Sequence, residues 1–522
     1  MAPRKTIVTS TSPLQALTSP ELVFGIVGAV GTDLDDVAAV LSEELSRVRY
    51  EAKKIKVSSL MYKIKQYKGL EKRQYGSDFY RVRAHMEAGS AIRERTKRGD
   101  FLALLAVAEI RRLRKQVSGD HNVPKEGSRV AYILRSLKHP DEIRTLRNIY
   151  GRAFYLVSAY SPRSVRINRL ATRIASSSQS ADHTGARSKA ETLVEIDEKE
   201  DRKLGQNVRE SFPLADAFVN ASSRPSVVAA LRRFIELVFS HPFHTPTRDE
   251  YAMFHAHAAA LRSADLSRQV GAAITTSDGG IIAVGSNDVP RFSGGLYWPE
   301  DVDDARDFRL GSDSNVAFRR EMVSELVLSL KDQGFFGRKI EMLKPQQIAD
   351  LLLAHDSFKE SIAASVIEFG RSVHAEMAAI SDAARRGVSV CGGTLYSTTF
   401  PCHLCARHII ASGITRVVYI EPYPKSRAER LFSDSISVDA AEPVIGKVAF
   451  APFVGIAPAI HTEMFKMVGD RKDKNGKAIR WIGERARPRL RRFVPSYITL
   501  EQQVIGKVLP EASISARLKL LN

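Results

Sequence analysis

Residues 371–423 of this chain have the sequence RSVHAEMAAISDAARRGVSVCGGTLYSTTFPCHLCARHIIASGITRVVYIEPY and decide the fold of its second half. The pattern predicts a helix at 372–387, a strand at 393–399, a helix at 400–413 and a strand at 416–423. Helices that alternate with short apolar strands are typical of a sheet with parallel strands. We therefore expect an α/β domain in this part of the chain.

Four residues of this stretch predict a metal centre. Cys402 and Cys405 are spaced by two residues at a helix start, so both thiolates reach one zinc ion, and His374 on a neighbouring helix supplies a third ligand. Three ligands leave a position open for water, which is typical of a catalytic site. Glu376, two positions past His374, is the expected general base, which takes a proton from water and passes it to the leaving group.

Other residues offer alternatives to this site. A structural zinc would need a fourth ligand, and His403 and His408 are the nearest candidates, although we expect both to pack or to face solvent. The remaining cysteine, Cys391, is expected to be a small buried hydrophobe on a strand.

Four further histidines offer donor atoms for a second metal site. Of these, His255 and His257 are two apart on a predicted helix and so do not share a face. We therefore expect no metal at this group, which comprises His241, His244, His255 and His257.

Length and composition indicate a folded protein of several domains. The chain has 522 residues, 44% hydrophobic and 26% charged, and a domain takes roughly 150 residues. Three cysteines exclude a disulfide-stapled scaffold. The chain has no apolar run of the ~18 residues that span a bilayer, and its first residues, MAPRKTIVTSTSPLQ, lack the apolar core of a signal peptide. We expect a cytoplasmic protein without a membrane partner.

The first half of the chain also predicts a parallel α/β sheet. A flexible tail at 1–20 is followed at 21–45 by an apolar strand, a glycine turn and a periodic helix. Basic helical segments follow, and then strands at 130–137 and 153–160 with a helix between them. A last strand and helix, LADAFVNAS and SVVAALRRFIELVFS, close the domain, and a Ser-rich loop is expected at 176–188.

The glycine turn departs from a phosphate-binding P-loop, whose pattern is G-x-x-x-x-G-K-[ST]. With Gly28 as the first glycine, Asp33-Leu34-Asp35 takes the place of Gly-Lys-Ser, so the lysine is lost and the added charge has the wrong sign for phosphate. Gly28, Gly31 and Thr32, with distal arginines, are still expected to hold a regulatory nucleotide. A scaffold without a ligand is the alternative, and phosphoryl transfer is not expected.

The domain boundary is expected at SHPFHTPTRDE, where two prolines interrupt the pattern. A helix at 251–266 precedes a hairpin of VGAAITT and IIAVGSN with the turn SDGG. An insert at about 289–370 is long enough to cover a pocket and to exclude a polymer. The expected domains are thus 21–240 and 245–522.

Basic residues concentrate in two segments. The net charge is +19, and 31 basic but only 11 acidic side chains lie between Arg47 and Arg173. Lys466–Arg492 adds 11 basic and 3 acidic side chains, so the remainder of the chain is net acidic. This asymmetry favours polyanionic ligands such as nucleotides or RNA, although a solvated basic face would have the same composition.

The motifs of residues 250–425 resemble the deoxycytidylate and cytidine deaminase superfamily, whose signature is H-x-E…P-C-x-x-C. The resemblance rests on LSRQVGAAITT, IIAVGSNDVP, HAEMAAI, TTFPCHLCARHII and VVYIEPYPKS. The whole chain resembles the bacterial anti-phage dCTP/dCMP deaminases, on TPTRDEYAMFHAHAAALRSADLSRQVGAAI, EPYPKSRAERLFSDSI and APFVGIAP. This implies a P-loop NTPase-like parallel-sheet domain, related to kinases, followed by a cytidine deaminase-like α/β/α sandwich.

The resemblance also implies a function. Members of this group convert dCTP and dCMP to deoxyuridine nucleotides during phage infection, are thought to be held inactive by a noncoding RNA, and are commonly homo-oligomers. Carried over by motif, the zinc ligands are His374, Cys402 and Cys405, and Glu376 moves protons. Substrate would be held by Asn287 at the sugar, by the amide of Ala375 at the pyrimidine carbonyl and by Arg268 at the phosphate.

Two other functions stay open. One is a deaminase of cytosine or adenine in tRNA or single-stranded DNA, which the basic segments would suit. The other is a binding or switch protein with a structural zinc. We favour free nucleotides because the stronger basic block lies in the front domain rather than around Asn287 and Glu376.

Overall fold

The computed structural model divides into two compact units, Met1–Pro246 with Val454–Asn522 and Thr247–Phe453. The expected tail at 1–20 lies outside the described residues except for its last two positions. None of the helices in the described part of the chain is both long enough and apolar enough to cross a membrane. The structure describes residues 19–72, 75–118, 128–178, 183–198, 205–355, 358, 361, 369–423, 426–440, 444–489 and 497–521.

The first unit is built on a sheet with the strand order β12-β5-β4-β1-β3-β2. Its strands are parallel except for β12, which pairs antiparallel with β5. The central strand β1 is buried along its whole length because helices cover both faces of a parallel sheet. The strands are β1 (Leu22–Gly28), β2 (Glu51–Lys56), β3 (Val130–Leu137), β4 (Phe154–Tyr160), β5 (Ala217–Asn220) and β12 (Gly455–Ile456).

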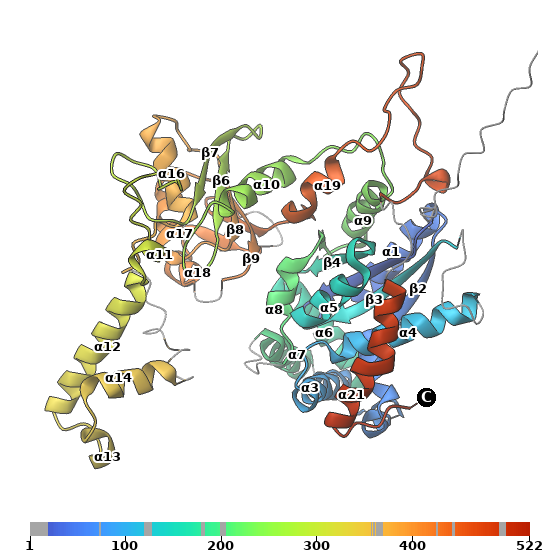
Figure 1. Ribbon diagram of the computed structural model, residues 1–522, viewed down its shortest axis with the longest axis horizontal. Helices are drawn as coiled ribbons and strands as arrows, with labels where there is room; N and C mark the ends of the chain where they lie inside the picture. Colours follow the sequence, from blue (N-terminus) through green and yellow to red (C-terminus); the bar gives the residue numbers. More distant parts are fainter. Residues whose placement is uncertain are drawn as a thin grey trace, which may run out of the picture. The chain divides into compact units, whose positions relative to one another are not determined.

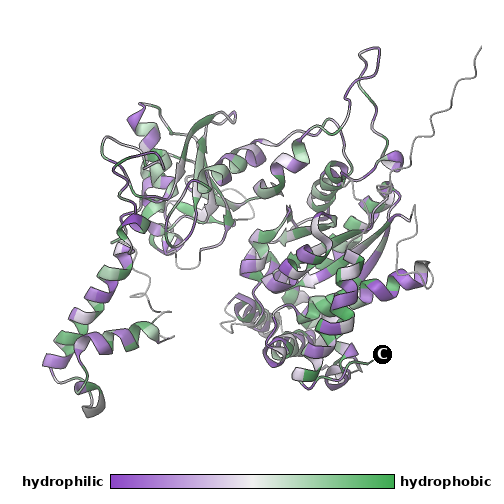
Figure 2. Ribbon diagram, in the orientation of Figure 1, coloured by the Kyte–Doolittle hydropathy of each residue, from purple (hydrophilic) through white to green (hydrophobic). Residues whose placement is uncertain are grey.

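Helices of the first unit follow its strands as the sequence predicts. Helices α1 and α9 pack against β1 in one hydrophobic core, and Figure 2 shows this sheet largely in the hydrophobic colour. The longer helices are α1 (Leu34–Arg47), α3 (Asp78–Thr96), α4 (Phe101–Ser118), α5 (Pro140–Tyr150), α6 (Arg163–Ser178), α7 (His183–Glu198) and α9 (Arg224–Val238). Short helices are α2 (Gly69–Lys72), α8 (Val208–Ser211), α19 (His461–Phe465), α20 (Tyr497–Gln503) and α21 (Leu509–Ser515).

Two expectations for this unit are corrected. The segment EAKKIK, which we expected to be helical, is strand β2 at the sheet edge, where only Ile55 is buried and the lysines remain in contact with solvent. The Ser-rich loop expected at 176–188 is shorter, because α6 continues to Ser178 and α7 starts at His183.

The chain returns to the first unit after Phe453, so the expected extent of the second domain, 245–522, is also corrected. Strand β12 extends the first sheet at β5. Farther on, the buried carboxylate of Glu501 accepts hydrogen bonds from Arg114 at 2.9 Å and from Tyr150 at 2.9 Å. These buried polar contacts join residues far apart in the sequence and attach the C-terminal helices to the first unit.

The second unit is built on a sheet with the strand order β10-β11-β9-β8-β6-β7. Strands β8, β9, β10 and β11 run parallel, whereas β6 and β7 form the expected antiparallel hairpin. The strands are β6 (Gly271–Thr275), β7 (Ile281–Ser286), β8 (Thr394–Thr399), β9 (Arg416–Glu421), β10 (Ile436–Val438) and β11 (Val448–Pro452).

Two glycines bring helices onto opposite faces of this sheet. A Cβ at Gly271 would lie 1.9 Å from the carbonyl oxygen of Ala256 on α10, and one at Gly285 would lie 2.2 Å from that of Ala375 on α16. Gly271 pairs with Ser286, the neighbour of Gly285, so the two glycines face opposite sides. The result is an α/β/α sandwich (Figure 1), whose helices include α10 (Arg248–Ala260), α16 (Ala375–Arg385), α17 (His403–Ala411) and α18 (Ala428–Leu431).

The insert after β7 forms a helical projection. Helices α12 and α14 pack on each other around a small core of Val323, Val327, Ile348 and Ala349, separate from the core around the sheet. The expectation that the insert covers a pocket stays a prediction, because most of 356–368 lies outside the described residues. The helices described here are α11 (Asp307–Leu310), α12 (Ser314–Asp332), α13 (Arg338–Glu341) and α14 (Pro345–Ala354).

Candidate metal centre

Two helix N-termini carry the predicted metal ligands. His374 is the N-cap residue of α16, and Cys402 is the N-cap residue of α17, where its sulfur accepts a hydrogen bond from the amide of Cys405 at 3.4 Å. Helix α16 packs against both β7 and α17. The helix ends therefore converge, and their exposed amides favour anionic sulfur ligands.

The three ligand atoms lie close enough to hold one ion. His374 Nδ1 is 3.2 Å from Cys402 Sγ and 3.4 Å from Cys405 Sγ. Zinc bonds of the usual length in tetrahedral geometry separate nitrogen and sulfur ligands by about 3.5 Å. The donor set and its spacing thus fit zinc with only small movements, and His374, Cys402 and Cys405 form a candidate zinc site.

A fourth protein ligand is absent from the described part of the chain. His403 and His408 are both half-buried, and neither joins the group of ligand atoms within 4.8 Å. The structural-zinc alternative therefore gains no support from them. An open coordination position is what a catalytic zinc requires.

Glu376 lies beside the ligands without belonging to them. It is 4% exposed, and its Oε2 accepts a hydrogen bond from the Cys405 thiol at 3.4 Å. Burial raises the pKa of Glu376, because the charged carboxylate loses its hydration. A carboxyl group in this position exchanges protons more readily near neutral pH than a solvent-exposed one.

Hydrogen bonds among the ligand side chains shift the pKa values of His374 and Cys402 in opposite directions. The hydrogen bond with Cys402 raises the pKa of His374 to about 9. Hydrogen bonds from Cys405 lower the pKa of the Cys402 thiol to about 4. Cys402 is therefore the sulfur most ready to bind a cation as thiolate, and a bound metal ion would deprotonate its partner as well.

The other predicted substrate contacts differ in their surroundings. Ala375, fully buried, starts α16 directly after His374. Asn287 is buried, but its side chain already accepts from the amide of Val270 at 2.6 Å and donates to the carbonyl of Arg268 at 2.7 Å. Arg268 is exposed, and its guanidinium lies 5.6 Å from the ring centroid of Tyr423.

The sequence did not single out the residues that hold the segment before His374. The amide of Val373 donates to the carbonyl of Asp288 at 2.9 Å, and the buried Arg306 lies 3.7 Å from the carboxylate of Asp288. Arg371 pairs with Asp307 at 2.9 Å. These arginines and aspartates follow no motif, so only tertiary structure identifies them.

Cys391 is exposed, which corrects the expectation of a buried residue on a strand. It lies in the turn before β8 rather than in the strand itself.

The predicted nucleotide-binding residues of the first unit line a cavity of about 640 Å³ at the carboxyl ends of β1 and β3. Gly28, Gly31 and Thr32 lie on its wall with basic residues that include Lys56, Arg81, Arg135, Arg169 and Arg173. One carboxylate oxygen of Asp197 accepts the amide of Val30 at 2.7 Å, and the other lies 3.3 Å from Lys138 Nζ.

Comparisons with known proteins concern mainly the second unit. Residues 246–421 match the family model described as "Cytidine and deoxycytidylate deaminase zinc-binding region". Deoxycytidylate deaminases of the enterobacteria phages T2 and T4 are each 49% identical over 55 residues, which is 10% of this chain and 29% and 28% of those enzymes. ComE operon protein 2 of Bacillus subtilis (strain 168) is 38% identical over 74 residues, or 14% of this chain and 39% of that protein.

Among solved structures, dCMP deaminase from the cyanophage S-TIM5 in complex with dCMP and dUMP aligns with 40% of this chain and 98% of its own at 17% identity, with a TM-score of 0.22. The aligned segments span less than two fifths of each curated relative named above. The family match includes His374, Cys402 and Cys405, the residues that the structure brings together. The similarity to the zinc-binding region of cytidine and deoxycytidylate deaminases is thus confined to residues 246–421, the part of the chain that carries the candidate zinc site.

Proposed function

We propose that the second unit deaminates the cytosine of free deoxycytidine nucleotides, converting dCMP, dCTP or both to deoxyuridine nucleotides and ammonia. The observation that carries the proposal is the position of Glu376, buried and 3.4 Å from a sulfur of a three-ligand metal site. A buried carboxyl group beside an open coordination position suits general acid–base catalysis on water.

The proposed chemistry balances as a hydrolysis. Zinc, when bound, supplies a Lewis acid that makes water more acidic. Glu376 accepts a proton from the attacking water, whose oxygen forms a bond to C4 of the cytosine ring, and passes that proton to N3. Glu376 then moves the remaining proton of the C4 hydroxyl to the amino nitrogen, the C4–N bond breaks, and ammonia leaves while the C4 carbonyl forms and N3 keeps its hydrogen. The pKa of Glu376, raised by burial, favours this return of the proton.

The start of α16 would orient the ring. The amide of Ala375 belongs to the first turn of the helix, where backbone N–H groups lack intrahelical partners. We assign it to the pyrimidine carbonyl. Asn287 has one side-chain N–H left after its bond to Arg268, and we assign that hydrogen to the sugar; Arg268 would meet the phosphate.

Glu376→Gln tests this assignment. The variant keeps the size of the side chain but cannot take up a proton, so we expect at least a 100-fold loss of turnover with zinc content unchanged, since general acid–base catalysis contributes roughly 10²–10⁴-fold. Asp382→Asn is the matched control, because this residue lies on the same helix in a surface pair with Arg385. Equal turnover in both variants would refute the role of Glu376.

A panel of substrates separates free nucleotides from polymers. We expect ammonia and deoxyuridine products from dCMP or dCTP and none from cytosine-bearing oligonucleotides. Uracil that appears only in the oligonucleotide would favour the alternative, a deaminase of tRNA or single-stranded DNA. Zinc binding without turnover of any substrate would favour the binding or switch protein.

For the first unit we propose a regulatory nucleotide in the cavity beside β1 and β3. Its support is the excess of basic side chains around that cavity and the buried Thr32 hydroxyl, which has no hydrogen-bond partner among the described residues. Titration calorimetry of the Glu376→Gln protein with dCTP, dTTP and ATP tests it. A regulatory nucleotide requires binding that Arg169→Ala weakens. Heat that Arg169→Ala leaves unchanged, as expected for dCTP bound at the second unit alone, or no heat with any nucleotide would favour a scaffold without a ligand.

Three further proposals rest on the resemblance to the anti-phage deaminases. They are depletion of deoxycytidine nucleotides during infection, inhibition by a noncoding RNA, and assembly into a homo-oligomer. The basic side chains between Arg47 and Arg173 suit the RNA, whose affinity should then fall steeply with salt. Association that salt does not change would contradict this.

A further inference from the structure

The end of α9 folds back on itself and brings three potential metal ligands together. Ser240 adopts a left-handed backbone conformation with φ 61°, and the amide of His241 donates to the carbonyl of Glu236 at 2.8 Å. This reversal places the segment from His241 to His244 beside the last turn of the helix. The sequence alone gave no reason to join Glu236 to these histidines.

The three side chains converge closely. His244 Nε2 is 2.7 Å from Glu236 Oε2, and the imidazole rings of His241 and His244 have centroids 4.2 Å apart. One ligand atom from each residue lies within 4.8 Å of the other two. His255 and His257, which we had grouped with them from the sequence, belong to α10 and do not join this group in the described structure.

An ion pair between Glu236 and His244 accounts for only part of this arrangement. The ring of His241 makes one long hydrogen bond among the described residues, accepting at Nδ1 from the amide of Phe243 at 3.3 Å. Two imidazoles in ring contact are unfavourable when both are protonated, since like charges would then face each other. A cation shared by both rings and the carboxylate satisfies all three groups.

Neighbouring side chains hold the group in place. The ring of Trp481 lies against His241 with centroids 5.1 Å apart, and its indole N–H donates to the carbonyl of Phe239 at 3.2 Å. Arg233 donates to the carbonyl of Thr245 at 2.8 Å and so fixes the far end of the segment. Such outer contacts orient ligands in metal sites.

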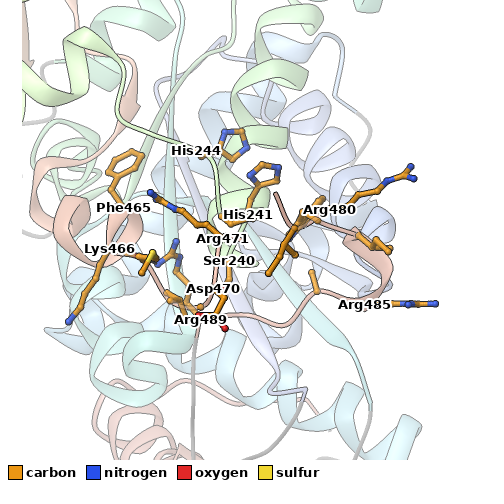
Figure 3. Close-up of a pocket in the computed structure, with 18 residues that line it drawn as sticks. Ser240, His241, His244, Phe465, Lys466, Asp470, Arg471, Arg480, Arg485 and Arg489 are labelled. Atoms are coloured by element: carbon orange, nitrogen blue, oxygen red, sulfur yellow. Dashed lines mark hydrogen bonds between the residues drawn. The ribbon is translucent and has the colours of Figure 1, made fainter. Parts of the chain in front are cut away.

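The two histidines face a cavity of about 440 Å³ with a basic lining (Figure 3). Figure 3 shows their rings next to each other, while Arg480 and Arg485 extend away from them. Arg471 also lines the cavity, and its side chain makes no hydrogen bond or ion pair with any residue that the structure describes. A ligand that completes the coordination of a metal ion here would therefore be water or an oxyanion such as phosphate, whose charge the basic lining would balance.

We propose that Glu236, His241 and His244 bind a divalent transition metal, with Zn²⁺ as the best match, at a site separate from the zinc centre of the second unit. Two imidazoles and one carboxylate are a known donor set for zinc with open coordination positions. In tetrahedral geometry the ligand atoms would lie about 3.3 Å apart, so Glu236 and His244 separate slightly while His241 approaches.

Cobalt substitution distinguishes the two sites because only one of them has sulfur ligands. The untagged full-length protein is stripped of metal, loaded with Co²⁺ and dialysed, and the metal per chain is measured together with the thiolate-to-cobalt charge-transfer absorption. We expect two ions in the unmodified protein. Cys402→Ser combined with Cys405→Ser should keep one ion and lose the charge-transfer absorption. His244→Gln should lose one ion and keep the charge-transfer absorption.

Glu236→Gln provides a second variant if His244→Gln is unstable, and His257→Gln is the matched control, a half-buried histidine outside the group. Circular dichroism checks that each variant is folded, because the charge-transfer absorption reports only on the cysteine ligands of the second unit. One ion per chain in the unmodified protein, or an unchanged ion count in both Glu236→Gln and His244→Gln, would overturn the proposal. Adding inorganic phosphate should tighten retention of the ion that the cysteine variant keeps.

Discussion

Gly285 is the position at which a single methyl group should disturb the candidate zinc site without touching a ligand. It lies on β7, and its missing side chain allows the backbone of α16 to contact the strand directly. Helix α16 starts immediately after His374 and carries Glu376 in its first turn. A change at Gly285 is therefore transmitted through the helix backbone to both residues.

The size of the disturbance follows from the distances. A Cβ at Gly285 would lie 2.2 Å from the oxygen of Ala375 and 2.5 Å from the amide nitrogen of Ala379, whereas real Cβ contacts essentially never fall below 3.0 Å. Gly285→Ala must therefore move the start of α16 by about 0.8 Å or more. Overpacking of this kind costs about 1–3 kcal/mol of unfolding free energy, and a shift of about 1 Å at reacting groups lowers turnover by roughly 100-fold.

The assay measures three quantities on the same samples: zinc affinity by competition with a chelator, dCMP turnover, and stability by denaturant unfolding. Gly271→Ala is the matched control, because its Cβ would press on α10 from the opposite face of the same sheet. We expect both variants to lose stability but only Gly285→Ala to lose zinc affinity. Gly337→Ala, with open space around it, should change nothing.

The reasoning would be refuted by a Gly285→Ala protein that binds zinc and turns over dCMP like the unmodified protein. Equal losses of zinc affinity in Gly271→Ala and Gly285→Ala would also contradict it, since the effect would then be a general loss of stability rather than a displacement of α16.

Three further predictions concern other contacts. The carboxylate of Asp249 accepts hydrogen bonds from Arg416 at 2.8 and 2.7 Å. Burial alone would raise the pKa of Asp249, but these bonds hold that pKa below its usual range. Asp249→Asn should therefore lower the free energy of unfolding, measured in urea, by about 1.5–3 kcal/mol. Because the pKa of Asp249 is lower in the folded than in the unfolded protein, the ion pair stabilises the fold at pH values above the unfolded-state pKa, and this contribution is lost as the pH falls through the folded-state pKa. The free energy of unfolding of Asp249→Asn should therefore change less between neutral and acidic pH than that of the unmodified protein. Arg114→Met leaves the carboxylates of Glu21 and Glu501 buried without their cation, and it should cost about 3–5 kcal/mol and make 497–521 sensitive to protease. A chelator should lower the Tm of the unmodified protein more than that of Cys402→Ser, which lacks one ligand of the candidate zinc site in the second unit, as scanning calorimetry would show.

Local patterns in the sequence were enough to predict the elements around the candidate zinc site. Each ligand sits at a helix start that follows a loop or strand with its own signal, so His374, Cys402 and Cys405 could be assigned without knowing how the sheet is ordered. The hairpin of β6 and β7 could likewise be predicted, because the four residues SDGG form its turn. Such features depend on neighbours in the chain, which is why they could be predicted.

Contacts between distant residues were not predictable in this way. The pairing of β12 with β5 involves only Gly455 and Ile456, too short a segment to show an alternating pattern. Glu501 is buried because Arg114 and Tyr150, more than 350 positions earlier, meet its carboxylate. An isolated glutamate in a helix is most often exposed, so nothing local distinguishes this one.

The glycine turn after β1 shows how composition and structure combine to explain a departure from a motif. Asp33 caps α1 by accepting the amide of Asp36 at 3.0 Å, and Asp197 accepts the amide of Val30 at 2.7 Å. These amides belong to the turn and helix start that would surround a phosphate in a P-loop. Asp33 and Asp197 already accept hydrogen bonds from these amides, so the amides are not available to a phosphate and the lysine that would bind the phosphate is not needed. A nucleotide in this cavity must therefore bind to the arginines or displace Asp197.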